Sequence, residues 1–223
     1  MLGPEHFPDV NIVTQANYLD KTSGKYGARI CRQVDEWETK QGTAREKRFV
    51  IPLPTDTVNE KIFLTVGNLS LSLVHAPGHA SDQLVVYQAD SGTLWAADML
   101  SDIEMPYVCD SLEAYEHTLE ILSAFEISVL VPGHGHATSL SAEIQTRITE
   151  DKDYLAELRE KVGRSIREGK TAEETVAYCE EMRHPLLKGN QSPHRLNVES
   201  VFLELGGNVN GAKLGWSQFV NDA

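Results

Sequence analysis

The feature that most constrains the fold is a series of short apolar runs, broken by turn residues, between Lys61 and Val131. Runs of this length, bounded by Gly, Asn, Asp and Ser, are typical of β-strands. The turns Gly67-Asn68 and Asp90-Ser91-Gly92 predict that the strands on either side of them pair as hairpins. This stretch is therefore predicted to be a strand-rich core. Its first four strands are expected at Ile62–Val66, Leu69–Val74, Leu84–Tyr87 and Thr93–Ala97.

A helix and one more strand are predicted to follow these four. Asp110 can cap a helix, and Glu113 stands three residues on, as in a capping box. Apolar side chains then recur at helical spacing as far as Phe125. The apolar run Ile127–Val131 comes almost at once, which predicts a buried strand reached by a helical crossover. The order of these elements predicts a β-α-β step and an α/β fold.

The C-terminal third is predicted to be helical. Apolar side chains from Ile148 to Ile166 keep a helical spacing that ends before Gly169. Thr171 begins a second capped helix, and Ser192 begins a third. We expect one compact unit, because 223 residues suffice for one good core. In it, residues 1–140 would hold the sheet and residues 141–223 would form a helical region packed on the same domain.

The N-terminal part shows a weaker pattern. A helix is expected from about Ala28 to Glu38, where apolar residues recur among charged ones. The stretch Phe49–Leu53 is apolar but is interrupted and followed by proline, which indicates an edge strand or a connection.

Charge and composition exclude several classes of partner and compartment. The formal net charge of −13 opposes binding to phosphate backbones and anionic lipid, so no nucleic acid partner is expected. No apolar run reaches the roughly 18 to 20 residues that span a bilayer, so no membrane span is expected, and Met1–Asp9 lacks the pattern of a signal peptide. Three well-separated cysteines argue against a disulfide framework and are interpreted as buried or idle thiols. These observations predict a cytoplasmic protein.

Three residues of metal-ligand type each follow a predicted strand: His79, Asp98 and His134. Loops that leave parallel strands meet at one edge of a sheet, so these side chains can converge. Imidazole and carboxylate together suit zinc, with iron or manganese as alternatives. Taken singly, each residue has an ordinary interpretation, because a histidine beside glycine is usually a turn residue and an aspartate at a strand end is usually a cap. Together they predict a metal site.

The motifs around these residues resemble those of the metallo-β-lactamase superfamily. They read Ala76-Pro-Gly-His79-Ala-Ser-Asp-Gln, Leu94-Trp-Ala-Ala-Asp98-Met-Leu and Val129-Leu-Val-Pro-Gly-His134-Gly. The resemblance implies a four-layer αββα sandwich in which His79 binds one metal, Asp98 bridges two, and His134 binds the second. It also implies hydrolysis of an ester, thioester or lactam in a small molecule by a metal-bound hydroxide. His75 and His136 match no ligand position and are interpreted as loop residues or as residues that orient a ligand.

One motif of that family is missing. The pattern H-x-H-x-D-H, which would supply the remaining ligands, occurs nowhere in the sequence. The leading hypothesis is therefore a truncated hydrolase with an incomplete αββα sandwich, whose metal binding is weak or absent. The sheet should then expose an edge or an apolar face that seeks a partner. One alternative is an active dinuclear enzyme completed by an upstream segment, a second copy or another chain, and another is a non-catalytic interaction protein on the same fold.

Two further expectations concern the surface. His6, His117, His184 and His194 are interpreted as surface or capping residues, and the acidic stretch Glu157–Glu181 as a solvated helical face with i,i+4 pairs to Lys and Arg. The substrate itself is not specified by any segment, and Ser101–Cys109 carries no recognisable signature.

Overall fold

The protein is described by a computed structural model that covers residues 4, 7, 9–43, 45, 47–182 and 191–208. Its centre is a five-stranded sheet in the order β3-β4-β5-β6-β7. The strands are β3 (Lys61–Val66), β4 (Leu69–His75), β5 (Leu84–Gln88), β6 (Thr93–Trp95) and β7 (Val129–Val131). These confirm the predicted strands, some with shifted ends.

Strand direction explains how three loops reach one edge of the sheet. β3 to β6 pair antiparallel in succession, and β6 pairs parallel with β7. Consequently β4, β6 and β7 run in the same direction, and the loops that follow them leave from the same edge. The crossover between β6 and β7 contains helix α3 (Leu112–Ser123), as the β-α-β prediction required.

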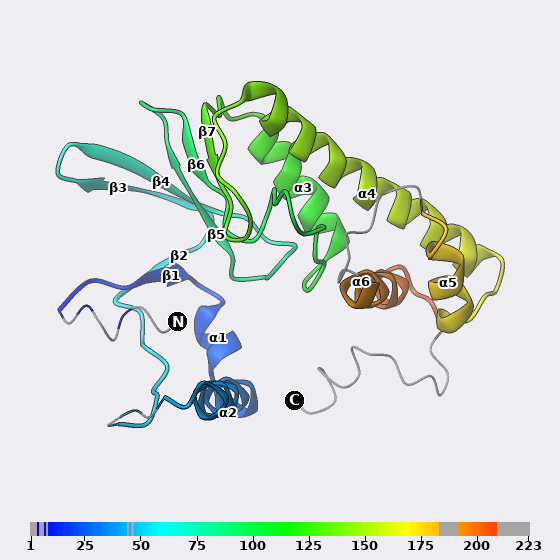
Figure 1. The fold of residues 1–223 in the computed structure, drawn as a ribbon, viewed down its shortest axis with the longest axis horizontal. Coiled ribbons are helices and arrows are strands. Elements are labelled where there is room, and N and C mark those ends of the chain that lie inside the picture. The colour runs from blue at the N-terminus through cyan, green and yellow to red at the C-terminus, as the bar shows by residue number, and fades with distance from the viewer. Residues whose placement is uncertain are drawn as a thin grey trace.

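The core lies between one face of the sheet and the helices (Figure 1). Side chains that alternate along the strands, such as Val85, Leu94 and Leu130, are fully buried there. They belong to one apolar cluster with α3 and with α4 (Ser141–Arg167), and the cluster continues to α5 (Ala172–Cys179) and α6 (Gln191–Glu204). The sheet and the C-terminal helices therefore share a continuous core.

The cap of α3 differs from the prediction. Ser111, not Asp110, is the N-cap, and its hydroxyl accepts a hydrogen bond from the backbone of Ala114 at 3.2 Å. The Asp110 backbone instead donates to Gly78 O at 3.1 Å. Glu204 of α6 takes the place expected for Glu113, because it accepts hydrogen bonds from the backbone N–H groups of the first turn. A tertiary contact thus replaces the local capping box.

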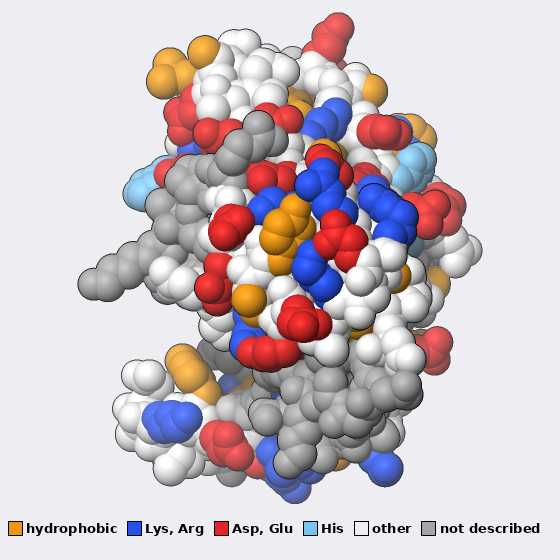
Figure 2. Space-filling view, turned by 90° about the vertical axis from the view of Figure 1, so that its right-hand side faces the viewer, with side chains coloured by type: hydrophobic (Ala, Val, Ile, Leu, Met, Phe, Trp, Pro, Cys, Tyr) orange, Lys and Arg blue, Asp and Glu red, His pale blue; other side chains and the backbone are white. Residues whose placement is uncertain are grey.

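The capping box at Thr171 is present as predicted, with Glu174 returning to the Thr171 backbone. The face that carries the C-terminal end of α4 and α5 shows Lys and Arg interleaved with Asp and Glu (Figure 2). Arg164 pairs with Glu160 at 2.5 Å, four residues apart, and Arg195 pairs with Glu173 at 2.5 Å. These pairs confirm the predicted solvated face.

One histidine prediction is wrong. His194 is 3% exposed rather than on the surface, and it lies between Tyr154 of α4 and the backbone of Cys179. Its two ring nitrogens meet buried polar partners from other helices, which residue spacing alone cannot reveal. His117 is exposed as predicted, while His6 and His184 lie outside the described residues.

The N-terminal elements form a group beside the sheet (Figure 1). They are β1 (Val13–Gln15), α1 (Tyr18–Thr22), α2 (Gly24–Gln41) and β2 (Asp56–Val58). β1 and β2 pair parallel as a two-stranded sheet. The helix predicted from about Ala28 is confirmed and starts earlier, and Phe49–Leu53 is a connection without regular structure. No helix in the described part of the chain is long and apolar enough to cross a bilayer.

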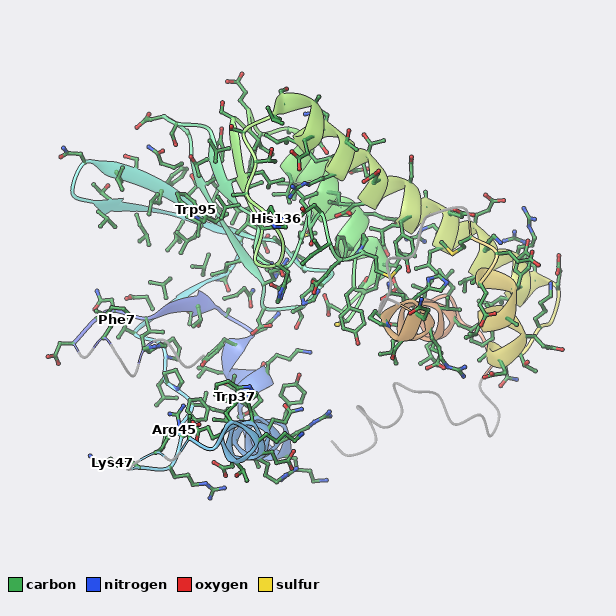
Figure 3. All side chains as sticks on the ribbon, in the orientation of Figure 1. Phe7, Trp37, Arg45, Lys47, Trp95 and His136 are labelled. Carbon is green, nitrogen blue, oxygen red and sulfur yellow. The ribbon has the colours of Figure 1, made fainter. Side chains whose placement is uncertain are left out.

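The sheet face opposite the helices is also apolar. One row of paired residues crosses all five strands on this face: Ile62, Leu73, Val86, Trp95 and Val131. Leu73 is 8% exposed but Trp95 is 42% exposed, so the face is only partly covered (Figure 3). The sequence predicted an exposed sheet edge or apolar face, and this apolar face is partly exposed.

Candidate metal centre

The three predicted ligands come together at the sheet edge where β4, β6 and β7 end. The Nε2 atom of His79 lies 3.3 Å from Oδ2 of Asp98, and the Nε2 atom of His134 lies 3.5 Å from Oδ1 of the same carboxylate. The hydrogen bond from His79 lowers the pKa of Asp98 against the opposing effect of burial. Each imidazole therefore faces a different oxygen of one ionised carboxylate.

The loop that carries His79 is held against α3 by a close backbone approach. Gly78 has φ +121°, and a Cβ at this position would lie 2.3 Å from the Cα of Tyr115. Only glycine fits both the conformation and the space. His75 stabilises the same loop, since its Nε2 lies 2.9 Å from Ser81 O. His75 itself is the last residue of β4 and pairs with Leu84, so the prediction that it is a loop residue is wrong.

The loops that carry Asp98 and His134 also pack directly on each other. A Cβ at Gly133 would lie 2.6 Å from Oδ1 of Asp98, and the Gly133 N–H donates to Ala97 O at 2.6 Å. Glycine beside the histidine thus makes room for the carboxylate, as the sequence pattern indicated.

His136 anchors the second histidine loop. Its backbone N–H and its ring Nδ1 each lie 2.8 Å from an oxygen of Asp102, in the loop after β6. Arg147, a buried side chain of α4, donates to the carbonyl of His136 at 2.9 Å. The side chain of His136 is 80% exposed. It lies in the loop after β7, in agreement with the prediction of a loop residue.

The donor types fit a metal pair, but their number does not. Structural and catalytic zinc sites use at least three protein ligands for each ion. Within the ranges that the structure describes, no group of three or more His, Cys, Asp or Glu side chains is arranged to hold an ion. In addition, Nδ1 of His79 is buried without a hydrogen-bond partner, whereas a ligating histidine usually has one. These residues alone do not make a complete metal site.

A cavity of about 230 Å³ opens beside the three residues. Its walls are largely apolar, with Leu100, Met105 and Tyr107 among them, and Glu104 lines it near His134. Two buried polar residues, Tyr115 of α3 and Asp151 of α4, also line it. Sequence analysis did not single out Tyr115, which falls on an apolar helix face, or Asp151 itself, although the long helix from about Asp151 to Arg167 is one that could line a substrate cleft or a dimer interface.

Comparisons with known proteins bear on the family of this chain. A family model described as "Metallo-beta-lactamase superfamily" matches residues 16–134, more than half of the chain. The chain is similar to a linear primary-alkylsulfatase of Pseudomonas sp., at 24% identity over 93% of this chain and 42% of that protein.

Solved structures give the same fold. A metallo-beta-lactamase family protein from Thermus thermophilus matches with a TM-score of 0.61 and 17% identity, over 87% of this chain and 65% of that one. The sec-alkylsulfatase Pisa1 from Pseudomonas sp. matches with a TM-score of 0.55 and 17% identity, over 71% of this chain and 28% of that one. The chain spans less than half the length of the alkylsulfatases it matches. The family match and the fold together show that this chain belongs to the metallo-beta-lactamase superfamily.

Proposed function

We propose that this chain carries one half of a dinuclear metal site in a metal-dependent hydrolase of small molecules. The observation that carries the proposal is the position of His79 and His134 on opposite oxygens of Asp98. When metal is bound, Asp98 would hold it together with His79 and His134. Zinc suits this mixture of imidazole and carboxylate, and iron or manganese are the alternatives.

The remaining ligands would come from another segment. The apolar row from Ile62 to Val131 supports this, because a second apolar sheet packed on it would lie beside the same sheet edge. An upstream segment of the polypeptide, a second copy or a complementing chain could provide that sheet. On its own the described part of the chain is expected to bind metal weakly.

The cleaved bond is proposed to belong to an ester, thioester or lactam. Sulfate esters are a further candidate, since a relative that is 24% identical is named a linear primary-alkylsulfatase. The cavity beside Asp98 has room for a small substrate and has apolar walls.

A hydrolysis screen tests this function. The chain would be supplied with zinc, iron or manganese and offered p-nitrophenyl butyrate, a butyryl thioester, a β-lactam and a linear alkyl sulfate. We expect slow turnover of at least one of these substrates, lost with a chelator and with Asp98→Ala, and retained in His117→Ala as the matched control. Bound metal without turnover of any substrate would favour the non-catalytic interaction protein instead.

A further inference from the structure

The inner wall of the cavity carries two buried polar groups, one of which, the Tyr115 hydroxyl, has no hydrogen-bond partner. Tyr115 is fully buried, and its hydroxyl has no hydrogen-bond partner. Burial raises the pKa of this hydroxyl, and the charges of Asp151 and Asp98 raise it further. Tyr115, Asp151 and Asp98 all line the same cavity.

Asp151 is the second of these groups. It is 5% exposed, and its Oδ2 accepts a hydrogen bond from the backbone N–H of Leu100 at 3.3 Å. The charge of Glu150, on the same helix, raises the pKa of Asp151, and the charge of Arg147 lowers it. Neither residue forms an ion pair with Asp151 among the described contacts. Burial raises the pKa of Asp151 to about 8, so the carboxyl group is mainly protonated at neutral pH.

A protonated carboxyl group and a phenol are both hydrogen-bond donors. Leaving the Tyr115 hydroxyl without a partner in the cavity wall is unfavourable, and a ligand oxygen that accepts from it and from Asp151 removes that cost. Pairs of donors of this kind, fixed in an apolar site, also stabilise the partial negative charge that a carbonyl oxygen develops during reaction.

We propose that Tyr115 and Asp151 form a binding subsite for the oxygen of an uncharged carbonyl compound, the apolar part of which contacts Leu100, Met105 and Tyr107. The subsite deepens the proposed function, because its use by a substrate rests on the hydrolase. Binding at the subsite needs only the cavity and can be measured without metal.

A cationic ligand is the competing occupant. Asp98, Glu104 and Asp151 line the cavity, and its described lining includes no Lys or Arg. If Asp151 were ionised, an ammonium group would be favoured over a carbonyl oxygen. Two probes of equal size separate these cases: 2-hexanone, which only accepts hydrogen bonds, and n-hexylammonium.

The experiment titrates metal-free, chelator-treated protein with each probe at pH 7 and follows binding by NMR. We expect 2-hexanone to bind the wild type at least fivefold more tightly than n-hexylammonium. Removing one hydrogen bond weakens a ligand by about fivefold, so Tyr115→Phe and Asp151→Leu should each weaken 2-hexanone by about that factor. Asp151→Asn should retain binding within about twofold, because an amide N–H still donates.

Asp153→Leu is the matched control, since Asp153 is an exposed aspartate on the same helix. Tyr115→Phe keeps the test decisive if Asp151→Leu does not fold, because it removes only an oxygen that has no partner. Tighter binding of n-hexylammonium, equal losses in Asp151→Asn and Asp151→Leu, unchanged binding in Tyr115→Phe, or no saturable binding of 2-hexanone would each overturn the subsite. Binding as expected in a chain that takes up no metal would leave the subsite standing and remove the proposed hydrolase.

Discussion

Asp102 holds His136 at two points, with the backbone N–H and the ring Nδ1 each 2.8 Å from its carboxylate. Because Asp102 follows β6 and His136 follows β7, this contact joins the loops that carry Asp98 and His134. The relative position of the two predicted ligands therefore depends on a residue that is not itself one of them.

Replacing Asp102 tests that dependence. Asp102→Ala removes two hydrogen bonds, one of them to a backbone group, and should lower the free energy of unfolding by about 1 to 2 kcal/mol. It should also weaken zinc binding, measured by calorimetry, because the two loops are no longer fixed to each other. Asp90→Ala, at an exposed aspartate in a turn of the same sheet, is the control and should change neither quantity. Equal zinc affinity in Asp102→Ala and wild type would show that the loops are positioned by other contacts.

The glycine before His79 gives a second prediction. Gly78→Ala places a methyl group against the backbone of Tyr115, which cannot move as a flexible side chain can. We expect a loss of roughly 3 kcal/mol or more in the free energy of unfolding, measured by urea denaturation. Gly42→Ala is the matched comparison, because Gly42 also has a positive φ of +67° but no atoms near the added Cβ. It should cost only about 1 kcal/mol. Similar costs at the two positions would contradict the close packing.

Asn197 of α6 forms hydrogen bonds to the segment 106–108, part of which lines the cavity. Its side chain accepts from Val108 N at 2.8 Å and donates to Pro106 O at 2.7 Å and to the Tyr154 hydroxyl at 2.8 Å. Asn197→Leu should cost about 3 kcal/mol, because several buried groups lose their partners.

Local loosening of that wall can be followed separately from global stability. Cys109 directly follows the segment 106–108 that Asn197 contacts. Burial raises the pKa of its thiol to about 12. In a background of Cys31→Ser and Cys179→Ala, the rate at which a thiol reagent labels Cys109 should rise several-fold in Asn197→Leu under native conditions. Leu203→Ala, at an exposed residue of the same helix, should leave that rate unchanged. An unchanged rate in Asn197→Leu would mean that the wall does not depend on α6.

The buried carboxyl group of Asp151 predicts a pH dependence of stability. Its pKa is raised from 3.8 to about 8 by burial, so the folded state holds this proton more tightly than the unfolded state. The protonated Asp151 carboxyl group contributes fully to the free energy of unfolding below about pH 4, and this contribution is lost as the pH rises through 8. The free energy of unfolding of the wild type minus that of Asp151→Asn should decline by up to about 1.4 kcal/mol per pH unit between these limits. Urea denaturation across this range measures the difference, and a flat difference would contradict a buried, protonated carboxyl group.

The sequence predicted the elements that depend on local pattern. The strands from Ile62 to Ala97 and the crossover before Val129 followed from apolar periodicity and turn residues, and the meeting of His79, Asp98 and His134 followed from their place after strands. Features set by contacts between distant segments were not accessible. Glu204 lies about ninety residues from the helix end that it caps, and His194 is buried by partners from α4 and α5.

The same reasoning explains the missed inner wall of the cavity. Tyr115 occupies an apolar helix face, where a tyrosine usually serves packing, and nothing in its spacing shows that the hydroxyl lacks a partner. Asp151 stands in a helix rich in charged residues, so its burial depends entirely on how α4 packs against the loop at Leu100. Only the assembled structure distinguishes it from the exposed Asp153 two residues later.

The most direct test of the central claim is the metal content of the purified chain, measured by elemental analysis after dialysis against low zinc. Wild type would be compared with the triple variant His79→Ala, Asp98→Ala, His134→Ala, and oligomeric state would be recorded on the same samples. The account predicts substoichiometric or weakly held zinc in the wild type, raised toward one or two ions per chain when a partner completes the site, and none in the triple variant. Equal metal content in the two proteins, including none in either, would contradict a metal centre at these three residues.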